Sequence, residues 1–360
     1  MKILFAFNRD LNPYVDVLVA GLGAAGCLVD MGTEKFWDAG LFDHDIVHIQ
    51  WPETLFDWRV PSVVEMHFLK RRLREIHSRA QIVFTLHNEV SHHANEGNEA
   101  VLKELYALIK SECDVMIHLG EASRRDCVAQ PELAGKRHVM IPIPIYDELY
   151  APHLGMDREE AKRRLGIPRG RKVVLAFGNF RYEGEKRLVI DAFSGLEDRR
   201  VCLVAPKWHK TLEYSFSPIH PMLALRTVRK AMWAWRNGMK LGAKKIMSDE
   251  EVAQHFAAAD VVFIQRLNEL NSGNVPMGFL FGKVVVGPDC GNIEEWLQVT
   301  GNPVFDAASS ASVCEALRRA LELSDSGLGE TNYRFAMERW STRQIGDSYV
   351  QLHKSIYDAR

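Results

Sequence analysis

Short apolar runs alternate along the chain with longer stretches in which apolar residues recur every three or four positions. In the first part of the chain the short runs are residues 2–7, 45–50, 81–87, 114–119 and 138–143. Helical periodicity marks the stretches between them, above all 60–78 and 98–111. Continuous apolar strands separated by helices predict a parallel sheet that is covered by helices on both faces.

The alternation pauses at residues 142–156, where Pro142, Pro144 and Pro152 stand among polar and aromatic residues, a composition typical of a linker. It resumes with apolar runs at 172–178, 200–206, 260–265, 283–288 and 302–306. A chain of 360 residues also exceeds the size at which one hydrophobic core usually stops growing. We therefore expect an α/β protein with two doubly wound, Rossmann-like parallel-sheet domains, whose ligands lie at the carboxyl ends of the strands.

The predicted domains are residues 1–150 and 151–341, with the end of the chain returning to the first domain. Ile345, Tyr349, Leu352 and Ile356 recur at helical spacing, so residues 342–360 should form a helix that packs one apolar face. We expect this helix to cross back to the N-terminal domain and hinges to lie near 142–156 and Trp340.

Composition narrows the functional classes. The net charge of −2 gives no general attraction to nucleic acid. The six cysteines are scattered without a C-x-x-C pair, as in a protein of a reducing compartment. The first apolar run is too short for a signal peptide, and no apolar stretch approaches a membrane span. These features predict a cytoplasmic protein that rests at most on the inner face of a membrane.

One segment departs from the ordinary balance of charges. Residues 223–245 contain many lysines and arginines and no acid, and Trp233 and Trp235 lie among them. Basic segments with aromatic residues suit an anionic membrane surface, so this segment is a candidate for peripheral membrane contact. A helical insertion with a cationic outer face, or a part of the phosphate environment, would have the same composition.

A glycine motif in the first domain suggests a different function. Gly21, Gly23 and Gly26 have the G-x-G-x-x-G spacing of dinucleotide-binding oxidoreductases. That motif requires a strand immediately before its first glycine, whereas Asn12-Pro13 begins a helical pattern here. We expect a helix that ends near Gly26, with glycines that serve its terminus and close packing.

Chemistry-bearing residues gather in the second half. Gly178 ends an apolar run, and Arg181 and Lys186 follow in a loop that leads into an amphipathic helix. Cations beside a helix start suit a diphosphate, although a solvated basic loop has the same composition. A second polar turn precedes the apolar residues 275–281 and consists of Asn271, Ser272, Gly273 and Asn274. It can offer backbone N–H groups to phosphate oxygens or simply cap a helix.

These segments together resemble the C-terminal domain of bacterial family 4 glycosyltransferases. The resemblance rests on "GNFRYEG" followed by "LVIDAF", and on "FGKVVVGPDCGNIEE". In the first half, "DIVHIQWPE" and "TLHNEVSHHAN" are similar to segments of the same enzymes, particularly those of capsule and exopolysaccharide synthesis. The family implies a GT-B fold, in which two Rossmann-like domains face each other across a cleft, and a nucleotide diphosphate-sugar donor bound without a metal ion or another cofactor.

The resemblance assigns roles to residues of this chain. Arg181, Lys186 and residues 271–274 would bind the donor diphosphate, and Glu269 would bind hydroxyls of the donor sugar. Gly178, Lys207, Glu294 and Glu295 are candidates for contacts with the nucleotide or its ribose. His92 or His93 would approach the reacting sugar, and the acceptor candidates are Trp51, Glu53, His87 and Asn88.

Two positions depart from the family pattern. Gly184 stands where the family has a phosphate-binding lysine, and Met277 stands where the second carboxylate of the E-x7-E pair usually holds the ribose. The expected function is transfer of a sugar to a glycan or lipid-linked acceptor, with retained anomeric configuration. The departures leave open a non-catalytic nucleotide- or glycan-binding protein on the same scaffold, and the glycine motif leaves open an oxidoreductase. The spacing of His87, His92 and His93 also permits a metal site.

Overall fold

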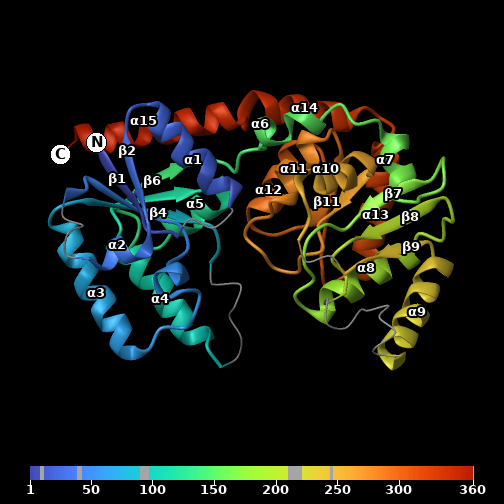
Figure 1. Ribbon diagram of the computed structural model, residues 1–360, viewed down its shortest axis with the longest axis horizontal. Helices are drawn as coiled ribbons and strands as arrows, with labels where there is room; N and C mark the ends of the chain where they lie inside the picture. The colour runs from blue at the N-terminus through green and yellow to red at the C-terminus, as the bar shows by residue number, and fades with distance from the viewer. Residues whose placement is uncertain (9–11, 39–42, 90–96, 210–220, 244–245, 360) are drawn as a thin grey trace. The chain divides into compact units, whose positions relative to one another are not determined.

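The computed structural model describes residues 1–8, 12–38, 43–89, 97–209, 221–243 and 246–359. The chain divides into two compact units (Figure 1). The first contains Met1–Pro144 and Arg339–Arg360, and the second contains Ile145–Glu338. The sequence boundary at 150 differs because residues 145–150 belong to the second unit, where the Tyr150 ring packs against Phe281 with centroids 5.9 Å apart.

The first unit is built on a six-stranded parallel sheet in the order β2-β1-β3-β4-β5-β6. The strands are β1 (Lys2–Phe5), β2 (Leu28–Met31), β3 (Ile46–Ile49), β4 (Gln81–Leu86), β5 (Val115–His118) and β6 (Arg137–Met140). The helices are α1 (Pro13–Ala24), α2 (Thr33–Trp37), η2 (Pro52–Phe56), α3 (Val63–His77), α4 (Glu99–Glu112), α5 (Glu121–Val128) and α15 (Thr342–Asp358). The sequence pattern did not predict β2, a short edge strand whose side chains are partly exposed and form no apolar run.

In the G-x-G-x-x-G motif, Gly21 serves helix packing and Gly26 serves the end of the helix, while Gly23 has open space around it. Gly21 and Gly23 lie inside α1, several residues after the end of β1. A Cβ atom on Gly21 would lie 3.2 Å from the Cα of Gly346 in α15, so the two helices approach through their glycines. Gly26 follows the helix with a φ of +82°, which glycine adopts without strain. The motif therefore lacks the strand–turn–helix setting that binds a dinucleotide.

The second unit contains another six-stranded parallel sheet, in the order β12-β11-β10-β7-β8-β9. Its strands are β7 (Lys172–Leu175), β8 (Val201–Ala205), β9 (Met239–Leu241), β10 (Val261–Phe263), β11 (Val284–Pro288) and β12 (Val304–Phe305). Its helices are α6 (Asp147–Tyr150), η3 (Ala151–His153), α7 (Arg158–Arg164), α8 (Glu183–Ser194), α9 (Pro221–Arg236), α10 (Asp249–Ala258), α11 (Asn274–Leu280), α12 (Gly291–Val299), α13 (Ser310–Leu323) and α14 (Leu328–Arg339).

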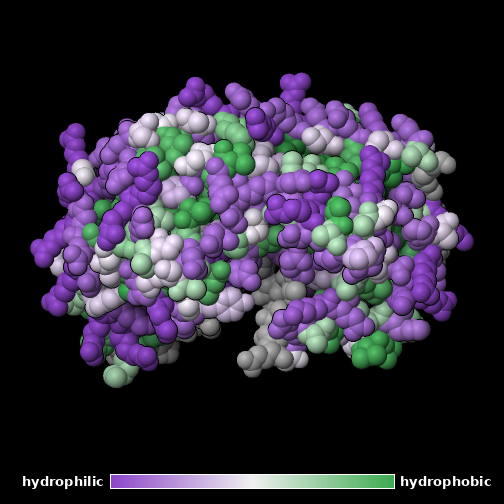
Figure 2. Space-filling model, turned by 180° about the vertical axis from the view of Figure 1, so that it is seen from behind, coloured by the Kyte–Doolittle hydropathy of each residue, from purple (hydrophilic) through white to green (hydrophobic). Residues whose placement is uncertain are grey.

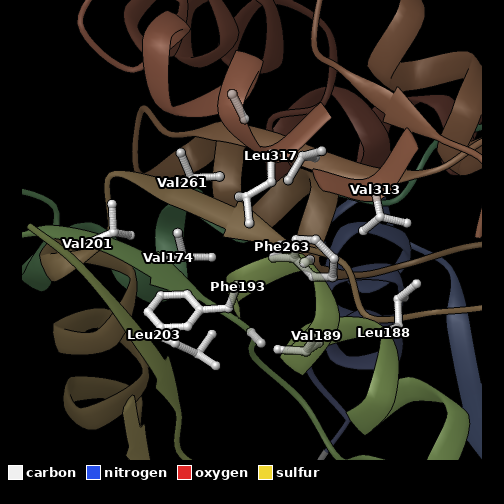
Figure 3. Close-up of a cluster of buried hydrophobic side chains, with 14 of the residues drawn as sticks. Val174, Leu188, Val189, Phe193, Val201, Leu203, Val261, Phe263, Val313 and Leu317 are labelled. Atoms are coloured by element: carbon white, nitrogen blue, oxygen red, sulfur yellow. The ribbon is translucent and has the colours of Figure 1, made fainter. Parts of the chain in front are cut away.

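Both sheets confirm the predicted doubly wound α/β class. The core of the second unit shows how the sequence specifies it: Val174, Leu203, Val261 and Phe263 project from the strands toward Phe193 of α8 and Leu317 of α13 (Figure 3). Residues of one face alternate along each strand, so burial of both faces requires continuous apolar runs. The three-residue strand β9 has no such run, which is why its sequence did not reveal it.

The strand orders place a crevice in each sheet. In the second unit the chain runs from β7 outward to β8 and β9, then returns to β10 on the other side of β7. In the first unit it runs from β1 to β2 and returns to β3. Loops leave in opposite directions at such switch points, and ligands of doubly wound sheets bind there, at the carboxyl ends of the strands.

The surface of each unit is mostly hydrophilic in the view of Figure 2, with hydrophobic residues in several small groups. Val63 and Val64, at the start of α3, are exposed. Among the described residues, no helix has the length and apolar character needed to cross a membrane. The described ranges also contain no group of three or more His, Cys, Asp or Glu side chains placed to hold a metal ion.

Candidate functional site

The switch point between β7 and β10 carries a polar cluster. Phe177 and Gly178 follow β7, while Gln265 and Arg266 follow β10. The Gln265 side-chain amide donates to the Phe177 carbonyl at 3.1 Å, and the Asn274 side-chain amide donates to the same oxygen at 2.7 Å. Two side chains thus fix the loop after β7 in one conformation.

Gly178 opens a space among these donors. Its φ is +105°, a conformation that other residues rarely adopt. A Cβ atom at this position would lie 3.5 Å from a terminal nitrogen of Arg266, 3.6 Å from Nε2 of Gln265 and 3.9 Å from Nδ2 of Asn274. A guanidinium and two amide groups therefore converge on a residue without a side chain. This is an arrangement in which a backbone can approach an anionic group closely.

A buried carboxylate holds Arg266 in place. Glu185 is 1% exposed, and its Oε1 accepts a hydrogen bond from Arg266 at 2.6 Å. Its Oε2 accepts from the backbone N–H of Arg181 at 2.6 Å, and the carbonyl of Asn179 accepts from Arg266 at 3.1 Å. Charge-assisted bonds on both oxygens offset the cost of burying the charge. One carboxylate thus fixes both the Arg266 side chain and the loop that carries Arg181.

Arg181 and Glu269 form an ion pair at the same strand ends. Their side chains are 27% and 14% exposed, so both can reach solvent. The structure therefore places Arg181, which was predicted to bind the diphosphate, beside Glu269, which was predicted to bind the sugar. A bound anion would compete with Glu269 for the guanidinium of Arg181.

The predicted lysines lie in different surroundings. The Lys186 ammonium donates to Glu183 at 2.8 Å, on the preceding turn of α8. Lys207 follows β8, and its ammonium lies 5.5 Å from the centroid of the Phe177 ring. Burial lowers the pKa of Lys207. Lys207 thus contacts the residue next to Gly178, whereas Lys186 is held by its own helix.

The polar turn before α11 is tied to its neighbours. The side chain of Asn271 accepts a hydrogen bond from Asn292 at 2.9 Å, and the Asn274 N–H donates to the hydroxyl of Ser272 at 3.3 Å. Gly273 is the N-cap of α11, which has only seven residues. The backbone amide of Asn274 is therefore engaged within the turn, and its side chain faces the loop after β7.

The departures from the family pattern are visible in this unit. Met277 lies in α11 and is 8% exposed, so an apolar side chain fills the position of the family's second carboxylate. Glu294 and Glu295 lie in the following helix α12, and Glu294 accepts from Gln298 at 2.8 Å. Gly184 lies in α8, next to the buried Glu185.

In the first unit, aromatic residues gather at the ends of β3 and β4. The rings of Trp51 and His87 stack with centroids 4.1 Å apart, and the edge of the Tyr14 ring meets His87 at 4.9 Å. His87 Nε2 lies 2.7 Å from Oε1 of Gln50, whose Nε2 lies 3.1 Å from His48 Nε2. Burial holds the pKa of His48 well below its usual value, so this imidazole is neutral.

Glu53 and Asn88 meet through Tyr106. The Tyr106 hydroxyl donates to Glu53 at 3.0 Å and also bonds Asn88. Glu53 is 2% exposed and Asn88 6% exposed, so both are part of the interior beneath the strand ends. Burial, and then the charge of Glu53, raises the pKa of Tyr106 well above its usual range. The structure brings Trp51 to His87 and Glu53 to Asn88, while His92 and His93 lie outside the described residues.

The sequence pattern did not predict the roles of Gln265, Arg266 and Glu185 in the second unit or of Tyr14 in the first. Gln265 is the last residue of the predicted strand 260–265 and Arg266 follows it, so their position at its carboxyl end was a usable signal. Glu185 gave no such signal, because a glutamate near a helix start usually faces solvent. Tyr14 gave no signal either, because it contacts His87, a residue far away in the sequence.

Comparison with solved structures shows similarity over the whole chain. Sucrose-phosphate synthase from Thermosynechococcus elongatus matches with a TM-score of 0.71 at 15% identity, covering 100% of this chain and 99% of that one. HepE from Anabaena, in complex with UDP-glucose, matches with a TM-score of 0.67 at 15% identity, covering 99% and 100%. A glycosyltransferase from Rickettsia africae matches at 0.65 and 12% identity, covering 100% and 99%.

The chain has the GT-B fold. Two Rossmann-like parallel sheets and near-complete coverage of these structures in both directions support that assignment. No protein-family model and no curated protein matches the sequence. At such low identity the similarity shows the architecture, and the activity has to be argued from the residues at the strand ends.

Proposed function

We propose that this protein is a glycosyltransferase that moves a hexose from a nucleotide diphosphate-sugar, with UDP as the first candidate nucleotide. The observation that carries the proposal is the convergence of Arg266, Gln265 and Asn274 on Gly178 at the switch point of the second sheet. HepE, which has the same fold, was solved with UDP and with UDP-glucose. A pyrophosphate is the part of such a ligand that calls for cations and N–H donors at strand ends.

The proposed chemistry is electrostatic. When the bond between the sugar and the diphosphate breaks, negative charge develops on the leaving phosphate oxygen. Arg266 is already oriented by Glu185, so it can stabilise this charge without reorganisation. Arg181 would join it after exchanging Glu269 for the phosphate. We propose that these cations serve without a metal ion or another cofactor.

Glu269 would then receive the hydroxyls of the donor sugar. Its carboxylate lies beside Arg181 and is partly exposed, so sugar and diphosphate would occupy adjacent positions. Lys207, beside Phe177, is the remaining basic candidate for the nucleotide. Glu294 and Glu295 stay predictions for the ribose, and the amides of residues 271–274 stay predictions for the diphosphate.

The first unit would bind the acceptor. Trp51 and His87 offer a stacked aromatic surface at the ends of β3 and β4, and Glu53 and Asn88 are buried and joined through Tyr106. We propose retention of anomeric configuration, with His92 or His93 near the reacting sugar. A glycan or lipid-linked acceptor of surface polysaccharide synthesis, met at the cytoplasmic face of the membrane, would suit the basic segment 223–245.

The second candidate is a nucleotide- or glycan-binding protein without transferase activity. Met277 favours it, because a thioether cannot accept hydrogen bonds from ribose hydroxyls as a carboxylate does. Binding of UDP without transfer over a panel of glycan acceptors would decide for this alternative.

The test is calorimetric titration of UDP into the intact chain. Loss of one charged hydrogen-bonding group costs about 1.5–3 kcal/mol, so Arg266→Ala should weaken UDP binding by about 10- to 150-fold. Arg319→Ala is the matched control, since Arg319 is exposed on α13 and pairs with Glu322. Absence of UDP binding in the unaltered protein would contradict the proposal, as would an Arg266 variant that binds like the control.

A second titration separates the sugar from the diphosphate. Glu269→Ala should weaken binding of UDP-glucose relative to UDP, because only the former has sugar hydroxyls. Since the variant also releases Arg181, UDP itself should bind at least as tightly as before. Equal losses for both ligands would show that Glu269 supports the site without meeting the sugar.

A further inference from the structure

Helix α9 presents two stripes of side chains to solvent. One stripe is apolar and consists of Leu225, Val228, Met232 and Trp235. The other stripe carries the positive charge and consists of Arg226, Arg229, Trp233 and Arg236. Within each stripe the residues are three or four positions apart, so they line up along the helix. Trp235 is 80% exposed and Leu225 54% exposed, and no acidic residue occurs in the helix.

The opposite face of α9 is small and buried. Thr227 is fully buried and Ala234 is 4% exposed, and Ala234 belongs to the same core as Leu203 and Met239. The helix thus uses small residues to attach to the unit and leaves its large apolar residues outside. A globular helix normally arranges these residues the other way round.

A cavity of about 760 Å³ lies beside the C-terminal end of α9. Its apolar wall includes Cys202 and Val204 of β8, Met239 and Leu241 of β9, and Ala231 of α9. Trp235 also lines it, so the exposed apolar stripe of α9 leads to its edge. The volume lies within the range of about 300–1,000 Å³ that is typical of ligand cavities.

Three cationic side chains, Arg164, Arg171 and Lys240, and one carboxylate, Glu251, line this cavity. Arg171 and Lys240 both line it, and neither has an ion-pair partner among the residues that the structure describes. Burial raises the pKa of the Cys202 thiol, and the charges of Arg171 and Lys240 act against that rise, which places both near the apolar wall. Arg164 lines the cavity too, but its charge is matched by Glu160 and Glu250.

The cavity is separate from the candidate nucleotide site. Its lining includes none of Gly178, Arg181, Arg266 or Glu269. One lining residue, His255, approaches that region, with its ring centroid 6.4 Å from that of Phe177. A ligand here would leave the strand ends of β7 and β10 unoccupied.

We propose that α9 and this cavity together bind an anionic phospholipid of a membrane leaflet. The lipid phosphate would bind Arg171 and Lys240, its chains would begin along the apolar wall, and the two stripes of α9 would lie in the interface. Aliphatic and aromatic residues beside arginines suit the boundary between headgroups and acyl chains. A nucleic acid would use the arginines but not the aliphatic stripe. The proposal rests on the proposed function only in its purpose, which is to bring the donor unit to a lipid-linked acceptor.

The membrane part is tested by vesicle sedimentation of the intact protein. Vesicles of equal parts phosphatidylcholine and phosphatidylglycerol should bind it, and vesicles of phosphatidylcholine alone should not. Each cation near an anionic surface is worth about 1 kcal/mol, so Arg226→Ala and Arg229→Ala should each weaken binding about fivefold. Arg319→Ala should have no effect. Equal binding to neutral vesicles, or equal loss in the control, would overturn the proposal.

The cavity is tested with dihexanoyl phosphatidic acid, which is soluble as single molecules, and with inorganic phosphate. The lipid should bind, and Arg171→Ala and Lys240→Ala should each weaken it at least tenfold, since each removes a charge-assisted bond. The matched control is Arg169→Ala, because Arg169 is exposed two residues before Arg171 and does not line the cavity. If phosphate alone binds as tightly, the cavity recognises a free anion and the lipid assignment is wrong.

The two proposals fail separately. UDP titration of the same variants should give unchanged affinity, because Arg171 and Lys240 lie outside the strand-end cluster. Vesicle binding without UDP binding would sink the transferase function and keep the lipid site. UDP binding without any lipid binding would contradict the lipid site and leave the proposed transferase function standing.

Discussion

Removing the carboxylate of Glu185 should destabilise the second unit far more than removal of any exposed acid of the same helix. This carboxylate is 1% exposed and accepts bonds from Arg266 and from the backbone of Arg181, both at 2.6 Å. Glu185→Ala leaves the guanidinium of Arg266, whose side chain is 12% exposed, with the Asn179 carbonyl as its remaining partner in this group.

The magnitude follows from the burial of the pair. Breaking a buried ion pair by removing one partner costs about 3–5 kcal/mol, because the other charge stays desolvated. Since the Arg266 side chain keeps some exposure and one carbonyl partner, we take the lower end, about 3 kcal/mol. For a domain of this size, each kcal/mol lowers the melting temperature by about 2–4 °C. The expected decrease is therefore about 6–12 °C.

Differential scanning calorimetry of the full chain measures this shift, with Glu183→Ala as the control. Glu183 lies in the same helix, its side chain is 81% exposed, and it pairs with Lys186 at the surface. Its removal should change the free energy of unfolding by less than about 0.5 kcal/mol. If Glu185→Ala melts within 2 °C of Glu183→Ala, roughly the effect of 1 kcal/mol, the reasoning about the buried pair is refuted.

Three further changes probe the site and the packing. Gly178→Ala combines a φ of +105° with a methyl group among the donors, so it should cost about 1–3 kcal/mol and weaken UDP binding, as denaturation and titration would reveal. Gly21→Ala meets Gly346 and should lower stability by about 1–3 kcal/mol, whereas Gly23→Ala, with open space around it, should be neutral or stabilising. Equal effects of the two would remove the case for close packing. Burial lowers the pKa of His353 from 6.5 to about 4, so the unfolded chain takes up a proton in this range and the folded chain does not. His353 should therefore contribute a fall of about 3 kcal/mol in the free energy of unfolding as the pH drops from 6.5 to 4, and His353→Gln, followed by urea denaturation, should remove that part of the slope.

Local sequence patterns were enough to predict the elements that carry the site. The runs at 172–178 and 260–265 predicted β7 and β10 and placed Gly178 at the end of the first, because fully buried parallel strands must be apolar on both faces. At the beginning of α3 the structure shows a capping box of Ser62 and Glu65, a local signal that did not enter the prediction of the helical stretch 60–78. Strands β2 and β9 escaped prediction because they lie at sheet edges and are short.

The pairings within the site could not be predicted in this way. Whether Arg181 would meet Glu269, and whether Lys186 would point to a phosphate or to Glu183, depends on contacts between residues far apart or on a choice of rotamer. The Gly184 position suggested a lost cation, and the structure shows that Arg266 lies at the same strand ends, held by the neighbouring Glu185. Nothing in a single sequence indicates that residues 185 and 266 will be in contact.

The sequence by itself thus determined the class of the protein: the alternation of strands and helices along the chain, the linker at 142–156, and the strand ends at which polar residues collect. These follow from periodicity and from the demand that apolar runs be buried, both local properties of the chain. Only the tertiary structure decided the strand order, and with it the switch point where β7 meets β10. That order brings Gly178, Gln265 and Arg266 together across some ninety residues of chain, because side-chain contacts between strands exist only once the sheet has formed.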